Sequence, residues 1–81
     1  MTVKVAFFAG AKEITGCDFL ELPLDDAATL LQVQQSLAAR YPELQLLLDR
    51  STWSVDHEYV THESELYDGA EIGMIPPVSG G

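Results

Sequence analysis

Apolar and polar positions alternate over the first nine residues of the chain. Val3, Val5 and Phe7 fall on one face of this segment, and the residues between them, followed by Phe8, fall on the other. A period of two is typical of a strand with one buried face. The pattern therefore predicts a strand over residues 2–9, with Phe8 at the outward end of its exposed face.

Several later segments also have the character of strands. Residues 17–22 place Leu20 and Leu22 inward, and Pro23 closes the segment. This segment is expected to pair with the first strand as a hairpin, across a turn or short helical loop. The other predicted strands cover residues 52–55, 59–60 and 70–75.

In the middle of the chain, apolar residues recur every three to four positions instead of every two. The apolar positions of that period are Leu30, Val33, Leu37 and Tyr41. This spacing predicts a helix with one apolar face. Thr29 fits the N-cap position, Gln32 fits the reciprocal position of a capping box, and Pro42 stops the helix. The apolar stretch that follows, residues 43–50, is expected to form a short helical turn.

One main helix covers only one face of a sheet, so the order of elements predicts a two-layer α+β domain. The last strand follows the helical crossover and can therefore lie parallel to the first strand in the middle of a mixed sheet. This arrangement is the β-grasp architecture of ubiquitin. We expect the β-grasp domain to span residues 1–75 and an extended C-terminal tail to span residues 76–81.

Strand parity predicts a docking surface beside this tail. Ile72 and Met74 face inward, which leaves Glu71, Gly73 and Ile75 outward. If the first and last strands are parallel, Phe8 and Ile75 become exposed neighbours at the edge where the tail begins. A covering loop would hide this pair, and a register shift of one residue would exchange the faces.

The charge balance narrows the range of partners. Thirteen acidic and four basic residues give a formal net charge of −9. This charge disfavours nucleic acid and anionic membranes and favours a basic protein surface, although it also serves solubility. No apolar run is long enough for a membrane helix and the start is a poor signal peptide. A single cysteine, Cys17, fits a reducing compartment, so we expect a cytoplasmic protein.

Other candidate chemistry is weak. Cys17 is interpreted as structural filler rather than a thiol relay. His57 and His62 lie five residues apart in a predicted strand and turn, which does not match the helical His-Glu-x-x-His spacing of zinc proteases. Trp53 is interpreted as core or interface packing. We therefore expect no metal site and no bound cofactor in this chain.

The C-terminal sequence Ile-Pro-Pro-Val-Ser-Gly-Gly raises a sharper possibility. Pro76 and Pro77 end the last strand and direct the chain outward in an extended form. Gly80 and Gly81 carry no side chains, so they can pass through a channel too narrow for other residues and present the terminal carboxylate. Adenylation by ATP would convert that carboxylate to a mixed anhydride that sulfide or a thiol can attack. The alternative is a frayed end without function.

The sequences DGAEIGMIPPVSGG and VKVAFFAGAKEITG, together with the length of the chain, resemble the small subunits of molybdopterin synthase, the MoaD-type sulfur carriers. The resemblance spans essentially the whole chain and is most specific over residues 68–81. Carriers for thiamine synthesis and tRNA thiolation share the diglycine but usually lack the PPVSGG stretch. A ubiquitin-like protein modifier and a plain interaction domain with an inert tail remain as alternatives.

The resemblance implies a mechanism in which this chain is a non-autonomous sulfurtransferase subunit. A ubiquitin-activating-like adenylyltransferase of the MoeB type uses ATP to form an acyl-adenylate on Gly81, and a sulfur donor converts it to a thiocarboxylate. The tail then enters the large subunit, of the MoaE type, where the sulfur passes to cyclic pyranopterin monophosphate during molybdenum cofactor biosynthesis. The implied assembly is a heterotetramer. The residues implied in partner binding are Phe8, Ile75, Pro76, Pro77, Val78, Ser79 and Gly80.

Two positions depart from the family pattern. Relatives commonly have an asparagine where this chain has Asp56, and a larger residue where it has Gly73. Neither position belongs to the tail. Asp56 is expected to alter a local turn or a contact at the rim of the docking surface.

Overall fold

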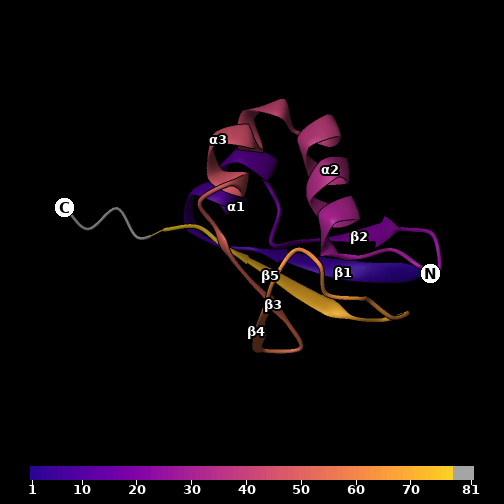
Figure 1. The fold of residues 1–81 in the computed structure, drawn as a ribbon. Coiled ribbons are helices and arrows are strands. Elements are labelled where there is room, and N and C mark those ends of the chain that lie inside the picture. Colours follow the sequence, from indigo (N-terminus) through magenta and orange to yellow (C-terminus); the bar gives the residue numbers. More distant parts are fainter. Residues whose placement is uncertain (78–81) are drawn as a thin grey trace.

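The structure is a computed structural model, and it describes residues 1–77 of the 81-residue chain. A five-stranded mixed sheet forms one layer and the helices form the other, on one face of the sheet (Figure 1). The elements in chain order are β1 (Thr2–Phe7), α1 (Ala9–Thr15), β2 (Phe19–Pro23), α2 (Leu30–Arg40), the 3-10 turn η1 (Pro42–Leu44), α3 (Gln45–Leu48), β3 (Thr52–Val55), β4 (Glu58–Val60) and β5 (Glu71–Ile75).

The strand order is β2-β1-β5-β3-β4, with β1 parallel to β5 and all other neighbours antiparallel. The predicted parallel pair in the middle of the sheet is therefore confirmed, as is the two-layer β-grasp fold. The loop between the first two strands is more regular than a turn, because residues 9–15 form α1. Gly16 ends this helix with a φ of 73°, a left-handed conformation that glycine adopts without steric cost.

The core lies between the sheet and the helices. Val3, Val5 and Phe7 of β1 are buried, and Leu30, Val33 and Leu37 of α2 pack against them from the other layer. These are the inward positions predicted by the two periodicities. Trp53, Ile72 and Met74 complete the sheet side of the same core, so Trp53 is a core residue.

Helix α2 begins where the capping pattern predicts. The backbone N–H and the hydroxyl of Thr29 both donate hydrogen bonds to Oε1 of Gln32, at 2.6 and 2.7 Å. The helix ends at Arg40, and Tyr41 leaves it half-buried with its ring edge-on to Phe7. Pro42 then opens η1, which leads into α3, so the predicted helical turn after α2 is confirmed.

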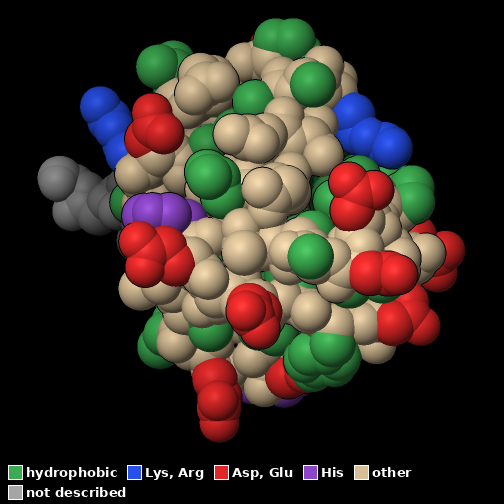
Figure 2. Space-filling view, turned by 45° about the vertical axis from the view of Figure 1, so that its right-hand side comes forward, with side chains coloured by type: hydrophobic (Ala, Val, Ile, Leu, Met, Phe, Trp, Pro, Cys, Tyr) green, Lys and Arg blue, Asp and Glu red, His purple; other side chains and the backbone are tan. Residues whose placement is uncertain are grey.

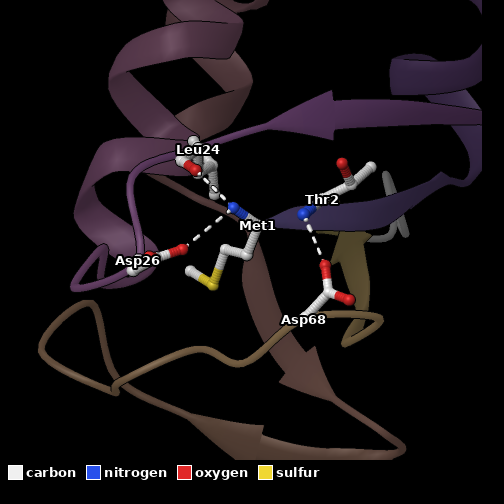
Figure 3. A network of polar contacts seen from close by, with 5 residues as sticks. All are labelled: Met1, Thr2, Leu24, Asp26 and Asp68. Atoms are coloured by element: carbon white, nitrogen blue, oxygen red, sulfur yellow. Dashed lines mark hydrogen bonds and ion pairs between the residues drawn. The ribbon is translucent and has the colours of Figure 1, made fainter.

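A small polar network fixes the start of β1, as Figure 3 shows. The N-terminal ammonium of Met1 donates to the carbonyl oxygen of Leu24 at 2.8 Å and to Oδ1 of Asp26 at 3.2 Å. The N–H of Thr2 donates to Oδ1 of Asp68 at 2.8 Å. These contacts hold β1 against the segment before α2 and against the turn before β5, so they help to align the two central strands.

Candidate functional site

The open face of the sheet, opposite the helices, carries Phe8 and Ile75, two of the residues predicted to bind partners. Because β1 and β5 run parallel, with Phe7 opposite Met74, the next residues Phe8 and Ile75 follow at the same edge of the sheet. Phe8 is 50% exposed and Ile75 is half-buried. The sequence prediction that this pair lies on the outward face is confirmed, and within residues 1–77 no loop covers it.

The position of Phe8 is set by α1. Phe8 has an extended backbone and serves as the N-cap of this helix, and its carbonyl oxygen accepts hydrogen bonds from the N–H groups of Ala11 and Lys12. Lys12 in turn pairs with Asp18, just before β2. The hydrogen bond and the negative charge of Asp18 raise the pKa of the Lys12 ammonium above its ordinary value of 10.5. The chain segment that carries Phe8 is thereby attached to both neighbouring strands.

A hollow of about 220 Å³ lies beside Phe8 and Ile75 on the open face. Its lining residues come from strands β1, β3, β4 and β5, from the residue after β1 and from the β3–β4 turn: Ala6, Phe8, Ser54, His57, Tyr59, Glu71, Ile72, Gly73 and Ile75. Tyr59 is 77% exposed, so the hollow has aromatic side chains on two sides. An exposed apolar surface of this kind is typical of a protein-binding site.

Sequence reasoning did not place Tyr59, Ser54 or His57 at this site. The alternation of Tyr59 with the half-buried Val60 was the available signal that Tyr59 faces outward. The missing information was the pairing of β3 with both β4 and β5, which sets Ser54 opposite Gly73 on one side and Tyr59 on the other.

The chain leaves the folded body close to this hollow. Pro76 is buried and Pro77 is exposed, so the folded body extends one residue beyond Ile75. The partner-binding roles of Pro76 and Pro77 stay predictions. Val78, Ser79, Gly80 and Gly81, the predicted tether and reacting residue, lie outside the described residues.

The two histidines do not share a site. His57 lines the open-face hollow, whereas His62 lies with Gln34 and Trp53 around a different depression. Within residues 1–77, no group of three or more His, Cys, Asp or Glu side chains is placed to hold a metal ion. Within the same range, no helix is long and apolar enough to cross a membrane.

Acidic side chains are spread over the molecular face drawn in Figure 2, where Lys and Arg appear only near its upper edges. This distribution agrees with the formal net charge of −9. A field of one sign over a surface steers the approach of oppositely charged partners. The surface is therefore suited to a basic protein partner.

These features together define a small ubiquitin-like β-grasp protein with an exposed, partly apolar hollow beside the start of a C-terminal segment that ends in two glycines. The family model of the ThiS family matches residues 5–81. The chain belongs to the ThiS family.

Two curated relatives match over more than nine tenths of their lengths. The molybdopterin synthase sulfur carrier subunit of Dictyostelium discoideum is 37% identical over 82 residues, which cover 96% of this chain and 94% of the relative. The subunit of the same name from Escherichia coli (strain K12) is 33% identical over 81 residues, covering 98% of this chain and 99% of the relative.

Solved structures confirm the fold. SAMP1 from Haloferax volcanii superposes with a TM-score of 0.90 at 22% identity, covering 100% of both chains. A putative molybdopterin converting factor, subunit 1, from Pyrococcus furiosus superposes with a TM-score of 0.86 at 27% identity, covering 95% of this chain and 98% of that one. A complex of subunits 1 and 2 of molybdopterin-converting factor from Helicobacter pylori 26695 contains a chain that matches with a TM-score of 0.71 at 23% identity, covering 100% of both.

Proposed function

We propose that this chain is the sulfur carrier subunit of a molybdopterin synthase. The observation that carries the proposal is full-length similarity to curated sulfur carrier subunits, at 37% identity in the Dictyostelium discoideum protein, in a chain that itself ends in Gly80-Gly81. The exposed Phe8 and Ile75 beside the start of the tail support it, because a carrier must dock while its terminus reacts elsewhere.

The reacting group is the carboxylate of Gly81. This carboxylate attacks the α-phosphorus of ATP in an activating enzyme of the adenylyltransferase class, and pyrophosphate leaves as the acyl-adenylate forms. A sulfur nucleophile at the oxidation level of sulfide then attacks the acyl carbon. The new C–S bond replaces the C–O bond to AMP, and a thiocarboxylate results. The chain supplies the acyl group and its delivery, whereas the activating enzyme supplies the nucleotide site.

The thiocarboxylate donates its sulfur inside a second protein, the large subunit of the synthase. The solved complex of subunits 1 and 2 of a molybdopterin-converting factor, in which one chain shares this fold, supports such a pairing. We propose that the open-face hollow docks on the large subunit, and that Val78–Gly81 reach the bound pterin precursor. Together the two subunits act as a sulfurtransferase, and this chain is the donor half.

Intact mass spectrometry tests the proposal. The chain is co-expressed with a MoeB-type activating enzyme in the presence of a sulfur source and purified, and its intact mass is measured. A variant that lacks Gly81 is the matched control. Exchange of one oxygen for sulfur in the full-length chain, but not in the variant that lacks Gly81, supports a carrier. An unaltered mass contradicts the proposal, and adducts joining Gly81 to lysines of other proteins indicate a protein modifier.

A further inference from the structure

The floor of the open-face hollow is made of the smallest side chains on the sheet. Strand pairing aligns five outward residues in one row across the sheet: Phe19, Ala6, Gly73, Ser54 and Tyr59. Aromatic rings stand at the two ends of this row, and three small residues lie between them. The three small residues and Tyr59 line the hollow, whereas Phe19 lies outside it, and Phe8 is the second aromatic residue of its lining.

Gly73 at the centre of the row keeps the depression open. A Cβ atom at this position would lie 2.6 Å from Oγ of Ser54, 3.8 Å from the ring of Phe8 and 3.9 Å from the side chain of Ile75. The φ of Gly73 lies outside the left-handed region, so the backbone does not require glycine here. The consequence of Gly73 is space for an incoming group, bordered by Ser54, Phe8 and Ile75.

One end of the hollow carries the exposed carboxylate of Glu71. Glu71 lines the hollow, and within residues 1–77 its carboxylate makes no ion pair. Its neighbour across the strands is Lys4, but the Lys4 ammonium lies over the ring of Phe19, 4.3 Å from its centroid. The carboxylate of Glu71 is thus left for a cation from outside the chain.

We infer that the hollow receives one arginine side chain of the partner protein, and this inference rests on the proposed function. The aliphatic stem of the arginine lies over Gly73 between Phe8 and Tyr59, and its guanidinium pairs with Glu71. Arginine suits both parts of the site, because its long aliphatic stem packs on apolar surface and its planar cation binds carboxylates through two hydrogen bonds. A second copy of this chain is disfavoured, because face-to-face contact would oppose two copies of Glu71 in proteins of net charge −9.

The first test fills the hollow. Gly73→Val keeps a strand-compatible residue, and the only close contact of its Cβ is the hydroxyl of Ser54, which can rotate away. Affinity for the large subunit of the synthase is measured by calorimetry. We expect Gly73→Val to raise Kd by about tenfold or more, because a blocked central pocket removes an anchoring contact. Thr52→Val, also outward on β3 but outside the hollow, is the matched control and should leave Kd within about twofold.

The second test removes the charge. Glu71→Gln and Glu21→Gln delete the same charge from the same face, opposite each other across Lys4, but only Glu71 lines the hollow. Glu71→Gln should raise Kd by about fivefold and weaken its salt dependence, whereas Glu21→Gln should change Kd by less than about twofold. Each arginine on the partner's docking surface is then replaced with methionine. For binding to one of these partner variants, Glu71→Gln should not raise Kd any further. That partner variant identifies the arginine that pairs with Glu71.

The outcomes separate this inference from the proposed function. The arginine pocket is wrong if the wild type binds and transfers sulfur and Gly73→Val has the same Kd as the wild type. The proposed carrier function is then unaffected. An equal loss of affinity in Glu71→Gln and Glu21→Gln also overturns it. Absence of any wild-type binding to the large subunit overturns the proposed function and the inference together. Self-association of the wild type in sedimentation experiments, abolished in Gly73→Val, would assign the hollow to a second copy and overturn the inference.

Discussion

Asp56 and Glu71 are joined by two hydrogen bonds that tie the β3–β4 turn to the first residue of β5. Oδ1 of Asp56 accepts a bond from the N–H of Glu71 at 3.0 Å, and the N–H of Asp56 donates to the carbonyl oxygen of Glu71 at 2.8 Å. Asp56 and His57 form the two-residue loop with φ values of 50° and 71°. Positive φ at both positions is the geometry of the tight hairpin turn that matches strand twist.

This relationship predicts the effect of three substitutions at Asp56. Asp56→Ala loses the side-chain acceptor and places alanine at a positive φ, so we expect the free energy of unfolding to fall by about 1–3 kcal/mol. Asp56→Asn keeps an acceptor and tolerates the conformation, and should change stability by less than about 0.5 kcal/mol. Asp56→Gly keeps the conformation and loses only the acceptor, so it should fall between them. Urea unfolding measures all three, and equal stability of the alanine and asparagine variants would contradict this role.

The tie also explains a departure noted from the sequence. Aspartate at position 56 provides the same acceptor atom as asparagine and, like asparagine, accepts a positive φ. Aspartate is therefore compatible with the turn, contrary to the expectation that Asp56 alters it, and its bond to the N–H of Glu71 fixes the residue at the end of the open-face hollow. Gly73 has a different consequence, because its missing side chain changes the shape of that hollow.

The spacing of apolar residues predicts most strands and the main helix of this fold, because the spacing within each segment depends only on that segment. The alternation around Val3 and Val5 and the helical spacing from Leu30 identify buried faces without knowledge of any partner strand. The parallel pairing of β1 with β5 followed from the order of elements. The outward face of Phe8 and Ile75 then followed from parity alone.

The hollow could not be predicted in this way, because it depends on pairing across four strands. Gly73 becomes the floor of a depression only when Ser54 and Ala6 are its neighbours, and those contacts join residues far apart in the chain. The burial of Pro76 is another such case, since the sequence shows a strand-ending proline but not the surface against which it packs.

The cap of α2 provides a test of the helix boundary. Gln32→Ala removes the acceptor for both the N–H and the hydroxyl of Thr29. We expect a loss of about 1 kcal/mol in the free energy of unfolding, which is typical for a helix N-cap interaction. Gln35→Ala is the matched control, because this exposed glutamine lies within the same helix and away from the cap. A similar loss in both variants would indicate a general effect of the substitution rather than capping.

The raised pKa of Lys12 predicts a pH dependence at high pH. A cation whose pKa is higher in the folded chain contributes stability below its unfolded-state pKa and loses it as pH rises through the folded-state value. The stability difference between wild type and Lys12→Met should therefore be constant from neutral pH to pH 10.5 and shrink above it. Denaturant unfolding at a series of pH values measures the difference. If the stability difference stays constant above that pH, charge pairing between Lys12 and Asp18 is not the cause of the difference.

Phe8 should matter for binding rather than for folding. Half of its surface is already exposed, so Phe8→Glu removes less buried area than a core substitution would, yet it places a charge beside the hollow. We expect a weakening of large-subunit binding of at least about tenfold with a stability change below about 1 kcal/mol. Leu46→Glu is the control, because Leu46 is 78% exposed on α3 in the helix layer, away from the open face. A large drop in Tm without a binding defect would instead assign Phe8 to the core.

Sulfur transfer should require the C-terminal segment to have its exact length, so that a change of one residue abolishes it. In the proposed mechanism the Gly81 carboxylate is the reacting group, and productive geometry requires the reacting atoms to approach within about 3–3.5 Å of each other. Deletion of Gly81, or addition of one alanine after it, moves that group by about 3.5 Å along an extended chain. Both variants should lose sulfur transfer in a reconstituted synthase assay while keeping the wild-type Tm and most of the affinity for the large subunit, because β1 to β5 and the hollow are unchanged. Normal rates from either variant would place the chemistry at another residue.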